Sequence, residues 1–302
     1  MLDTEEVLHI IMLSTMTSSA MAANTFYVFV IKTKTPKNLS SYANILFNIA
    51  CVDFLAALCS FMCIASLQNV GGRMVFVYLG PCTALNEHWC HRFFAGHANF
   101  VVQSVLLLLT SFAYRLRVLK TDSEHQLRHG KLWTAFRIVI LALALPNTVN
   151  FPIHQVVKIV YIQLLLSFVG TYEVPGLSLK RTISVYNLSG GLSDNLFTRC
   201  AVLNNLLLYF IGFVTILLIR RKLFFGIIAL SSSDRYNHQL IYRSLTAQMM
   251  LPLAYVFGTS LWLLDVVGLI HSQALQRSIL ILSSLFALVS PLINLYYIPP
   301  YR

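Results

Sequence analysis

Long, continuous apolar runs are the feature that most constrains how this chain can fold. A helix needs roughly 20 apolar residues to cross the hydrocarbon core of a bilayer. Because the runs are continuous rather than alternating, they exclude a transmembrane β-barrel. They predict seven membrane-spanning helices, at approximately residues 7–31, 43–67, 93–118, 132–152, 200–219, 245–270 and 277–298.

The composition agrees with a membrane protein. Of the 302 residues, 57% are hydrophobic and 11% are charged, and the mean hydropathy is +0.70. A soluble domain of this length has too few charges here to cover so much apolar surface. We therefore expect residues 1–302 to form a single all-α, multi-pass domain in the lipid bilayer.

The distribution of charge predicts the orientation. A net charge of +11 is also found in proteins that bind nucleic acid. Here, however, most basic residues lie in every second connection between spans, as at Lys32, Lys34 and 220–222, so they gather on one side of the membrane. Acidic Glu5 and Glu6 precede the first span, which has no basic region ahead of it and is too long for a cleaved signal peptide. By the positive-inside rule the N-terminus is extracellular and the C-terminus cytoplasmic. Nucleic acid is not predicted as a partner.

Residues 156–170, VVKIVYIQLLLSFVG, leave the count of spans open. They form either an eighth span or an amphipathic segment of one long extracellular loop, 153–199. The run is short, and a crossing there places Arg220 and Arg221 outside the cell, against the charge rule. We therefore expect seven spans.

Asp53 lies in the middle of the second predicted span, where a carboxyl group is costly. One interpretation is a structural carboxyl group bonded to neighbouring helices. The other is an ion or proton site that changes occupancy between two conformations. The sequence leaves both open.

Polar residues in the third span share one face. His97 and Arg115 are 18 residues apart, about five helical turns, and Ser104, Leu108 and Ser111 fall near the same stripe. The serines suit close helix packing. His97 is either a packing residue or a ligand contact.

Prolines mark three of the predicted spans, at Pro146, Pro252 and Pro291. A proline frees a backbone carbonyl and kinks a membrane helix. Pro252 therefore predicts a sixth helix that is suited to swinging. Pro291 is followed by the polar residues Asn294 and Tyr297.

Three cysteines, Cys82, Cys90 and Cys200, fall on the outer, oxidising side, where a disulfide is expected. A Cys82–Cys90 bond closes a short loop, and a Cys90–Cys200 bond ties the third helix to the long loop. Both pairings stay open. Asn187 begins a glycosylation sequon in that loop.

No catalytic constellation is present in the sequence. It has no nucleotide-binding glycine loop, no HExxH and no G-x-S-x-G motif. His88, Cys90 and His91 lie close together, but their spacing fits no closed four-ligand zinc pattern. We predict neither an enzyme nor a bound metal or cofactor.

Several segments together are similar to a known family. Asn48 and Asp53 resemble the second-helix Asn–Asp pair of rhodopsin-like receptors, and Cys90 precedes Arg115 by 25 residues, as the outer cysteine and inner arginine of their third helix do. The closer resemblance is to the nematode serpentine chemoreceptors of the delta class (Srd), which are seven-transmembrane G-protein-coupled receptors. The segments that carry it are KTPKNLSSYANILFNIACVDF, GPC at 80–82 with Cys90, SFAYRLRVL, HQLIYRSLTAQMMLP and PLINLYYIPPYR.

The resemblance implies that Arg115 is the cytoplasmic arginine that gates engagement of a heterotrimeric G protein. Ala113 and Tyr114 precede it, so no adjacent acid holds it, and a closed-state contact must come from elsewhere or be weak. Ser290 stands before Pro291, where many rhodopsin-like receptors have asparagine. The residues expected to take part in switching and coupling are Asn48, Asp53, Tyr114, Arg115, Pro252, Pro291, Asn294 and Tyr297.

The predicted function is a chemosensory receptor in the plasma membrane of sensory-neuron cilia. The expected ligand is a small molecule that binds in the outer half of the bundle, and volatile molecules belong to the expected class. The alternative is a small transporter or channel that uses Asp53 as an ion site. The candidate ligand-lining residues are His97, Gln103, Asn204, Asn205, Tyr209, Tyr255 and Trp262.

Overall fold

A bundle of long helices makes up most of the structure, a computed structural model that describes residues 4–36, 40–70, 73–85, 87–120, 182–186, 196–228, 232–266 and 273–301. Within these residues six long helices occur. Their bounds are α1 Thr4–Lys34, α2 Ser40–Cys63, α3 Glu87–Lys120, α8 Leu196–Ile228, α9 Ser232–Val266 and α10 Gln273–Tyr297.

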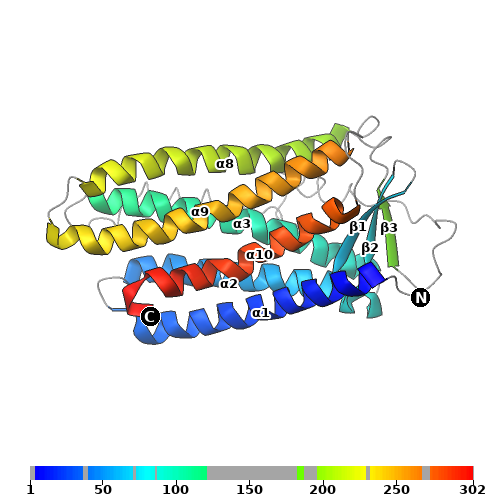
Figure 1. Cartoon of the computed structure of the whole chain (residues 1–302), viewed down its shortest axis with the longest axis horizontal. Coiled ribbons are helices and arrows are strands. Elements are labelled where there is room, and N and C mark those ends of the chain that lie inside the picture. The colour runs from blue at the N-terminus through cyan, green and yellow to red at the C-terminus, as the bar shows by residue number, and fades with distance from the viewer. Residues whose placement is uncertain are drawn as a thin grey trace, which may run out of the picture.

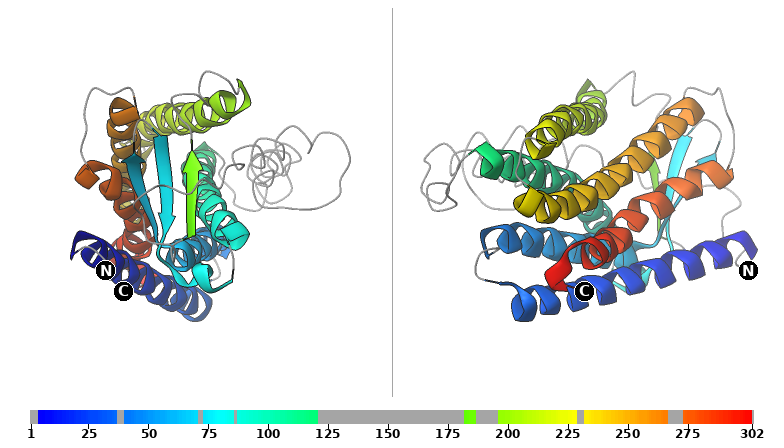
Figure 2. Two further views of the ribbon diagram at one scale, coloured as in Figure 1. Left: turned by 90° about the vertical axis from the view of Figure 1, so that its right-hand side faces the viewer. Right: turned by 60° about the vertical axis from the view of Figure 1, so that its left-hand side comes forward.

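The helices lie side by side along the long axis of the molecule (Figure 1). α2 packs between α1 and α3, α8 packs on α3 and α9, and α10 packs on α1 and α9. The N-terminus lies at one end of the bundle, with the strands, and the C-terminus lies at the other (Figures 1 and 2). We call these the outer end and the inner end.

Predicted spans and observed helices correspond closely where the structure describes both. Spans 7–31, 93–118 and 200–219 lie within α1, α3 and α8. Among the described residues, three stretches are long and apolar enough to cross a bilayer by length and composition: Tyr42–Cys63, Arg92–Leu119 and Leu280–Tyr297. The predicted span 132–152 lies outside the described residues.

The second span is shorter than predicted. α2 ends at Cys63 rather than near residue 67, and strand β1 (Ala65–Val70) begins two residues later. Between them Ile64 has a φ of 33°, a left-handed conformation that is rare for a β-branched residue. The apolar run continues through this turn, and hydropathy alone does not distinguish a helix from a strand.

A three-stranded antiparallel sheet at the outer end was not predicted. β1 pairs with β2 (Arg73–Tyr78), and β2 pairs with β3 (Thr182–Tyr186) from the long loop. The register joins Val70 to Arg73, so only Gly71 and Gly72 separate the first two strands. A Gly-Gly pair between two segments of β-forming residues is a hairpin signal, and it was available in the sequence.

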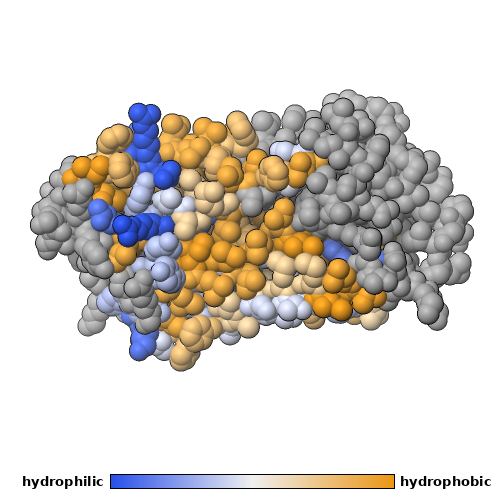
Figure 3. All heavy atoms as spheres, in the orientation of Figure 1, coloured by the Kyte–Doolittle hydropathy of each residue, from blue (hydrophilic) through white to orange (hydrophobic). Residues whose placement is uncertain are grey.

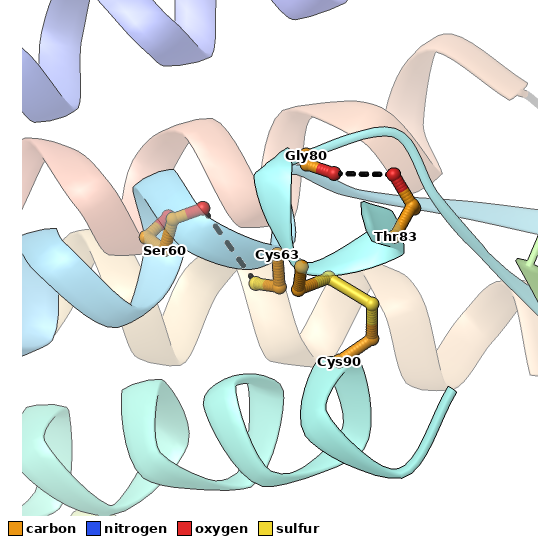
Figure 4. The surroundings of a disulfide bond; sticks show 6 residues. Ser60, Cys63, Gly80, Thr83 and Cys90 are labelled. Carbon is orange, nitrogen blue, oxygen red and sulfur yellow. Dashed lines mark hydrogen bonds between the residues drawn. A yellow bond between two sulfur atoms is a disulfide. The ribbon is translucent and has the colours of Figure 1, made fainter. Parts of the chain in front are cut away.

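A disulfide fixes the start of α3 to the segment that follows the sheet. The sulfur atoms of Cys82, in the short 3-10 helix η2 (Pro81–Ala84), and Cys90 are bonded, with 5.1 Å between their Cα atoms (Figure 4). Of the two pairings that the sequence left open, the structure has this one. Cys200 lies in α8, where its side chain is outside the described residues.

The directions of the helices are relevant to whether residues 156–170 form an eighth span. α3 ends at the inner end, whereas β3 and the start of α8 lie at the outer end (Figure 1). Lys120 and Thr182, the described residues on either side of this interval, therefore lie at opposite ends of the bundle. The expectation of a single span between them stays a prediction. Residues 156–170 and Asn187 themselves lie outside the described residues.

The surface has the pattern of a membrane protein. A belt of hydrophobic residues covers the middle of the visible face, and hydrophilic residues gather at the inner end (Figure 3). Exposed Phe26, Phe29, Phe210 and Leu218 point away from the core. The exposed cations Lys32, Lys34, Arg221, Lys222 and Arg243 lie in the inner parts of α1, α8 and α9.

Candidate functional site

A stripe of four polar side chains and one leucine runs along the buried face of α3. His97, Ser104, Leu108, Ser111 and Arg115 are each at most 6% exposed. This confirms the face predicted from helical spacing. Because α3 contacts α2, α8 and α9, the stripe lies against other helices rather than lipid. We call these residues and the polar groups that contact them the polar seam.

At the outer end of the polar seam, the His97 side chain connects α3 to α2 and α10. Its Nδ1 lies 3.0 Å from the Ala56 carbonyl oxygen of α2, and its Nε2 lies 2.9 Å from the Ser283 hydroxyl of α10. A carbonyl only accepts, so Nδ1 carries a proton and donates it. With both nitrogens engaged, His97 acts as a tie between helices. A ligand that contacts its ring nitrogens must displace one of these bonds.

In the middle of the seam Asp53 is buried between α2 and α3. Its Oδ1 accepts a hydrogen bond from the Ser104 hydroxyl, and Ser290 of α10 also approaches the carboxyl group. Its Oδ2 has no hydrogen-bond partner among the described residues. About two turns farther out, the hydroxyls of Ser60 and Ser284 lie 3.0 Å apart and join α2 to α10.

Asn24 of α1 satisfies a carbonyl that a proline leaves free. Pro291 has no N–H, so the carbonyl of Ala287, four residues earlier in α10, lacks its helical partner. The Asn24 side-chain amide donates to that oxygen at 2.8 Å and to the Ala20 oxygen at 2.9 Å. Ala20, Ala57 and Ala287 form a small-residue contact that lets α1, α2 and α10 approach closely.

We expect Asn24→Leu to lower the thermal midpoint of the detergent-solubilised protein by about 2–4 °C, because the Ala287 carbonyl loses its donor at a cost of roughly 1–2 kcal/mol. The control is the same substitution in a Pro291→Ala background. Alanine at 291 restores a backbone donor for the Ala287 carbonyl, so the loss there should be less than half as large. Equal losses in both backgrounds would contradict this assignment.

Side-chain hydrogen bonds connect α9 to α10. Ser244 donates to Asn294 Oδ1 at 2.9 Å, and Gln248 Nε2 donates to the Ser290 carbonyl at 3.4 Å. Pro252 lies four residues beyond Gln248 within α9. On the other side Arg220 of α8 reaches the Thr246 hydroxyl at 3.4 Å. The inner half of α9 is thus packed against both neighbours, an arrangement that we call closed.

Arg115 ends the seam inside an aromatic cluster. Its guanidinium carbon lies 3.7 Å from the centre of the Tyr42 ring of α2, and the Tyr114 ring stacks on Tyr42. No carboxylate of the described residues pairs with Arg115, and its Nε and Nη2 have no hydrogen-bond partner there. The hydroxyl of Tyr301, in the 3-10 helix η4 (Pro299–Tyr301), lies 3.1 Å from the hydroxyl of Thr35, the residue that follows α1.

Not all of the predicted switch residues come together. Asn48 is exposed whereas Asp53 is buried, because five residues on a helix turn the side chain by about 140°. The structure therefore does not join them as a pair. Pro291 and Asn294 are buried in α10, and Tyr297 lies edge-on to Tyr296.

Two of the candidate ligand-lining side chains are described. His97 faces α2 and α10, and Gln103 is half-buried six residues later, about 120° around α3, so they do not share a face. The others lie in described helices but their side chains are outside the described residues: Asn204, Asn205, Tyr209, Tyr255 and Trp262.

Several residues that connect the helices were missed by sequence reasoning. Tyr42, Ser283 and Gln248 belong to residue types that are common in membrane helices, and no local pattern marks them. Asn24 had a signal, because an amide in the middle of an apolar span requires an explanation. A freed carbonyl four residues before Pro291 also predicts a donor, but not which helix supplies it.

A bundle with an apolar belt around its middle, a basic inner end, an outer disulfide and a buried polar seam defines a class, the multi-pass helical membrane proteins. The family model described as "Serpentine type 7TM GPCR chemoreceptor Srd" matches residues 9–302. The chain belongs to this family. Its fold class is therefore the seven-transmembrane receptor, and the family is one of chemoreceptors and not of enzymes.

Similar proteins of Caenorhabditis elegans carry the same class name. Serpentine receptor class delta-18 is 26% identical over 276 residues, 89% of this chain and 79% of that protein. Serpentine receptor class delta-19 is 26% identical over 277 residues, 89% and 78% of the two chains. Serpentine receptor class delta-33 is 23% identical over 308 residues, 100% and 86% of the two chains. These similarities confirm the resemblance found in the sequence.

Proposed function

We propose that this chemoreceptor binds a small molecule among the outer halves of its helices and activates a heterotrimeric G protein at its inner end. The proposed location is the plasma membrane of sensory-neuron cilia. The observation that carries the proposal is the polar seam of α3, whose buried residues extend from His97 to Arg115. It connects the proposed ligand region to the proposed G-protein surface through groups that contact α2 and α10.

We expect the bundle to have a second arrangement, in which some of the hydrogen bonds between helices are broken. Each tie in the seam is lost if its two helices separate, and an unpaired polar group is costly away from water. A ligand that lodges near His97 alters the contact of α3 with α10 through Ser283. It shifts the equilibrium only if it binds one arrangement more tightly than the other.

α9 is the helix that we expect to move. Hydrogen bonds from Ser244 and Gln248 connect its inner half to α10, and Pro252 provides a hinge within the helix. Moving its inner half away from α10 and α8 opens the inner end beside Arg115. A segment of Gα then supplies hydrogen-bond acceptors to the guanidinium.

We expect the ligand to be a small molecule of a class that suits the helices around the seam. The candidate lining residues His97, Gln103, Tyr209, Tyr255 and Trp262 each carry a polar group, and they belong to helices that are otherwise mostly apolar. Such a lining suits small, mostly apolar molecules that form one or two hydrogen bonds. Asn204 and Asn205 add amide groups from α8. These residues are our candidates for the ligand site, in which His97 and Gln103 contribute from different faces of α3.

The test is nucleotide exchange on Gα in membranes that contain the receptor. A panel of small alcohols, ketones, esters and carboxylic acids is applied, with receptor-free membranes as the control. We expect at least one compound to raise exchange only when the receptor is present. Solute flux through the purified protein that disappears in Asp53→Asn, with no G protein present, would instead support the transporter or channel function.

A further inference from the structure

Aromatic rings surround Arg115, and no acidic side chain among the described residues pairs with it. Ala113 and Tyr114 precede it in the sequence, and no carboxylate of the described residues pairs with it. Instead, its guanidinium carbon lies 3.7 Å from the centroid of the Tyr42 ring and 5.9 Å from that of Tyr114. Both distances are within the range over which a cation is attracted to an aromatic face.

We infer that Tyr42 is the closed-state latch of Arg115: its ring holds the guanidinium away from the G-protein surface until α9 moves. The inference rests on the proposed function, which gives Arg115 its role in G-protein engagement. Tyr42 is 2% exposed and Arg115 is 6% exposed. A cation–π contact is strongest where water is excluded, so this burial favours a contact that contributes to the closed arrangement.

The latch has a rigid support. The Tyr42 and Tyr114 rings are stacked, with centroids 6.0 Å apart and an interplanar angle of 13°. Farther out, α2 and α3 are joined by the Asp53–Ser104 and Ala56–His97 hydrogen bonds. Tyr42 therefore belongs to a helix pair whose relative position is fixed, and the guanidinium is the part that can turn away.

A latch formed by an aromatic ring differs from one formed by an acidic side chain in the group that stays buried after the arginine has moved away. When Arg115 leaves, Tyr42 remains an uncharged side chain in the apolar inner core of Leu46, Phe112 and Ile298. A buried acid would instead remain as an unpaired charge, which strongly opposes release. The free Nε and Nη2 of Arg115 are then available to the carbonyl or carboxylate oxygens of the partner. We therefore expect a measurable level of activity without ligand.

The first test compares ligand-free nucleotide exchange on Gα among three variants. Tyr42→Leu removes the ring and should raise exchange about tenfold, as expected for the loss of a desolvated cation–π contact. Tyr42→Phe keeps the ring and should stay within about twofold of wild type. The matched control is Phe47→Leu, which removes the ring that lies 5.5 Å from the Lys32 amine on the same helix as Tyr42, and should change nothing.

A second series keeps the side-chain shape constant. Phenylalanine and its mono-, di- and trifluorinated forms at position 42 weaken the negative face of the ring in steps, so activity without ligand should rise in the same order. This series answers the question even if Tyr42→Leu fails to fold. No trend along the series would overturn the latch.

A measurement that needs no G protein tests the latch independently of the proposed function. Spin labels at Lys32→Cys and Arg243→Cys, both at exposed positions, report the distance from α1 to the inner part of α9 in a Cys51→Ser background. Tyr42→Leu should populate a longer distance. A longer distance without nucleotide exchange would leave the latch intact and count against the G-protein function. An unchanged distance together with unchanged exchange would overturn the latch.

Discussion

Arg115→Ala is expected to abolish ligand-driven nucleotide exchange on Gα while the receptor still reaches the cell surface. Arg115 is the buried cation at the inner end of the polar seam, with free donors at Nε and Nη2. A hydrogen bond to a charged group contributes roughly 1.5–3 kcal/mol. Losing one such bond to the partner reduces coupling about tenfold to a hundredfold, and alanine removes all of them.

The matched control for this experiment is Arg117→Ala, which removes the same charge two residues later on α3. Two residues turn the side chain by about 200°, so Arg117 lies on another face of the helix. Surface expression is measured with an epitope at the N-terminus on intact cells. Wild-type signalling by Arg115→Ala, or equal loss in the two variants, would contradict the role of Arg115.

The latch adds a prediction about the double variant. Tyr42→Leu alone raises activity without ligand, because it frees Arg115. Arg115→Ala also removes the latch, but it leaves no guanidinium for the partner to bind. Tyr42→Leu combined with Arg115→Ala should therefore be as silent as Arg115→Ala alone, and activity in the double variant would contradict both assignments.

Gly80→Ala is expected to prevent correct folding of the outer end. A Cβ atom at this position would lie 2.4 Å from the Met62 carbonyl oxygen and 2.7 Å from the carbonyl carbon of Cys63. These are backbone atoms of α2 that cannot move aside as a side chain does. The φ of −90° at Gly80 suits any residue, so the requirement is for space. We expect a loss of about 3 kcal/mol or more.

Displacing Gly80 would also disturb the hydrogen bonds and the disulfide around it. Its N–H donates to the Cys63 carbonyl and its carbonyl accepts from the Thr83 hydroxyl, beside the disulfide (Figure 4). Displacing it also strains the connection from β2 to α3. The measurement is the folded fraction by size-exclusion chromatography after detergent extraction. Gly212→Ala is the control, because among the described residues its Cβ would meet the Val105 side chain, at an ordinary 3.7 Å.

Local periodicity determined much of this molecule from the sequence. The apolar runs located α1, α3 and α8, because a bilayer requires the same length of helix wherever the run occurs. The spacing of His97 and Arg115 predicted one buried face, because the turn of a helix is fixed by its own backbone. The order of five short segments indicated the Srd family, which the family match over residues 9–302 confirms.

The local sequence pattern predicts less well the point where a helix is followed by a strand. The apolar run continues from α2 past Cys63 into β1, and in the structure the left-handed backbone of Ile64 separates the two elements. The pairing of Cys82 with Cys90 was one of two possibilities, because spacing bounds a disulfide but does not choose among three cysteines. The Gly-Gly hairpin signal was present but has little weight in a chain dominated by helices.

Partners across helices were decided by tertiary structure alone. Asn24 meets the Ala287 carbonyl 263 residues away, and Tyr42 meets Arg115 from another helix. Asn48 and Asp53 lie close in sequence but on different sides of α2. Periodicity tells which side chains share a face, but the rotation and approach of neighbouring helices decide what that face meets. Those depend on packing of small residues such as Ala20 and Ala57, which no single segment specifies.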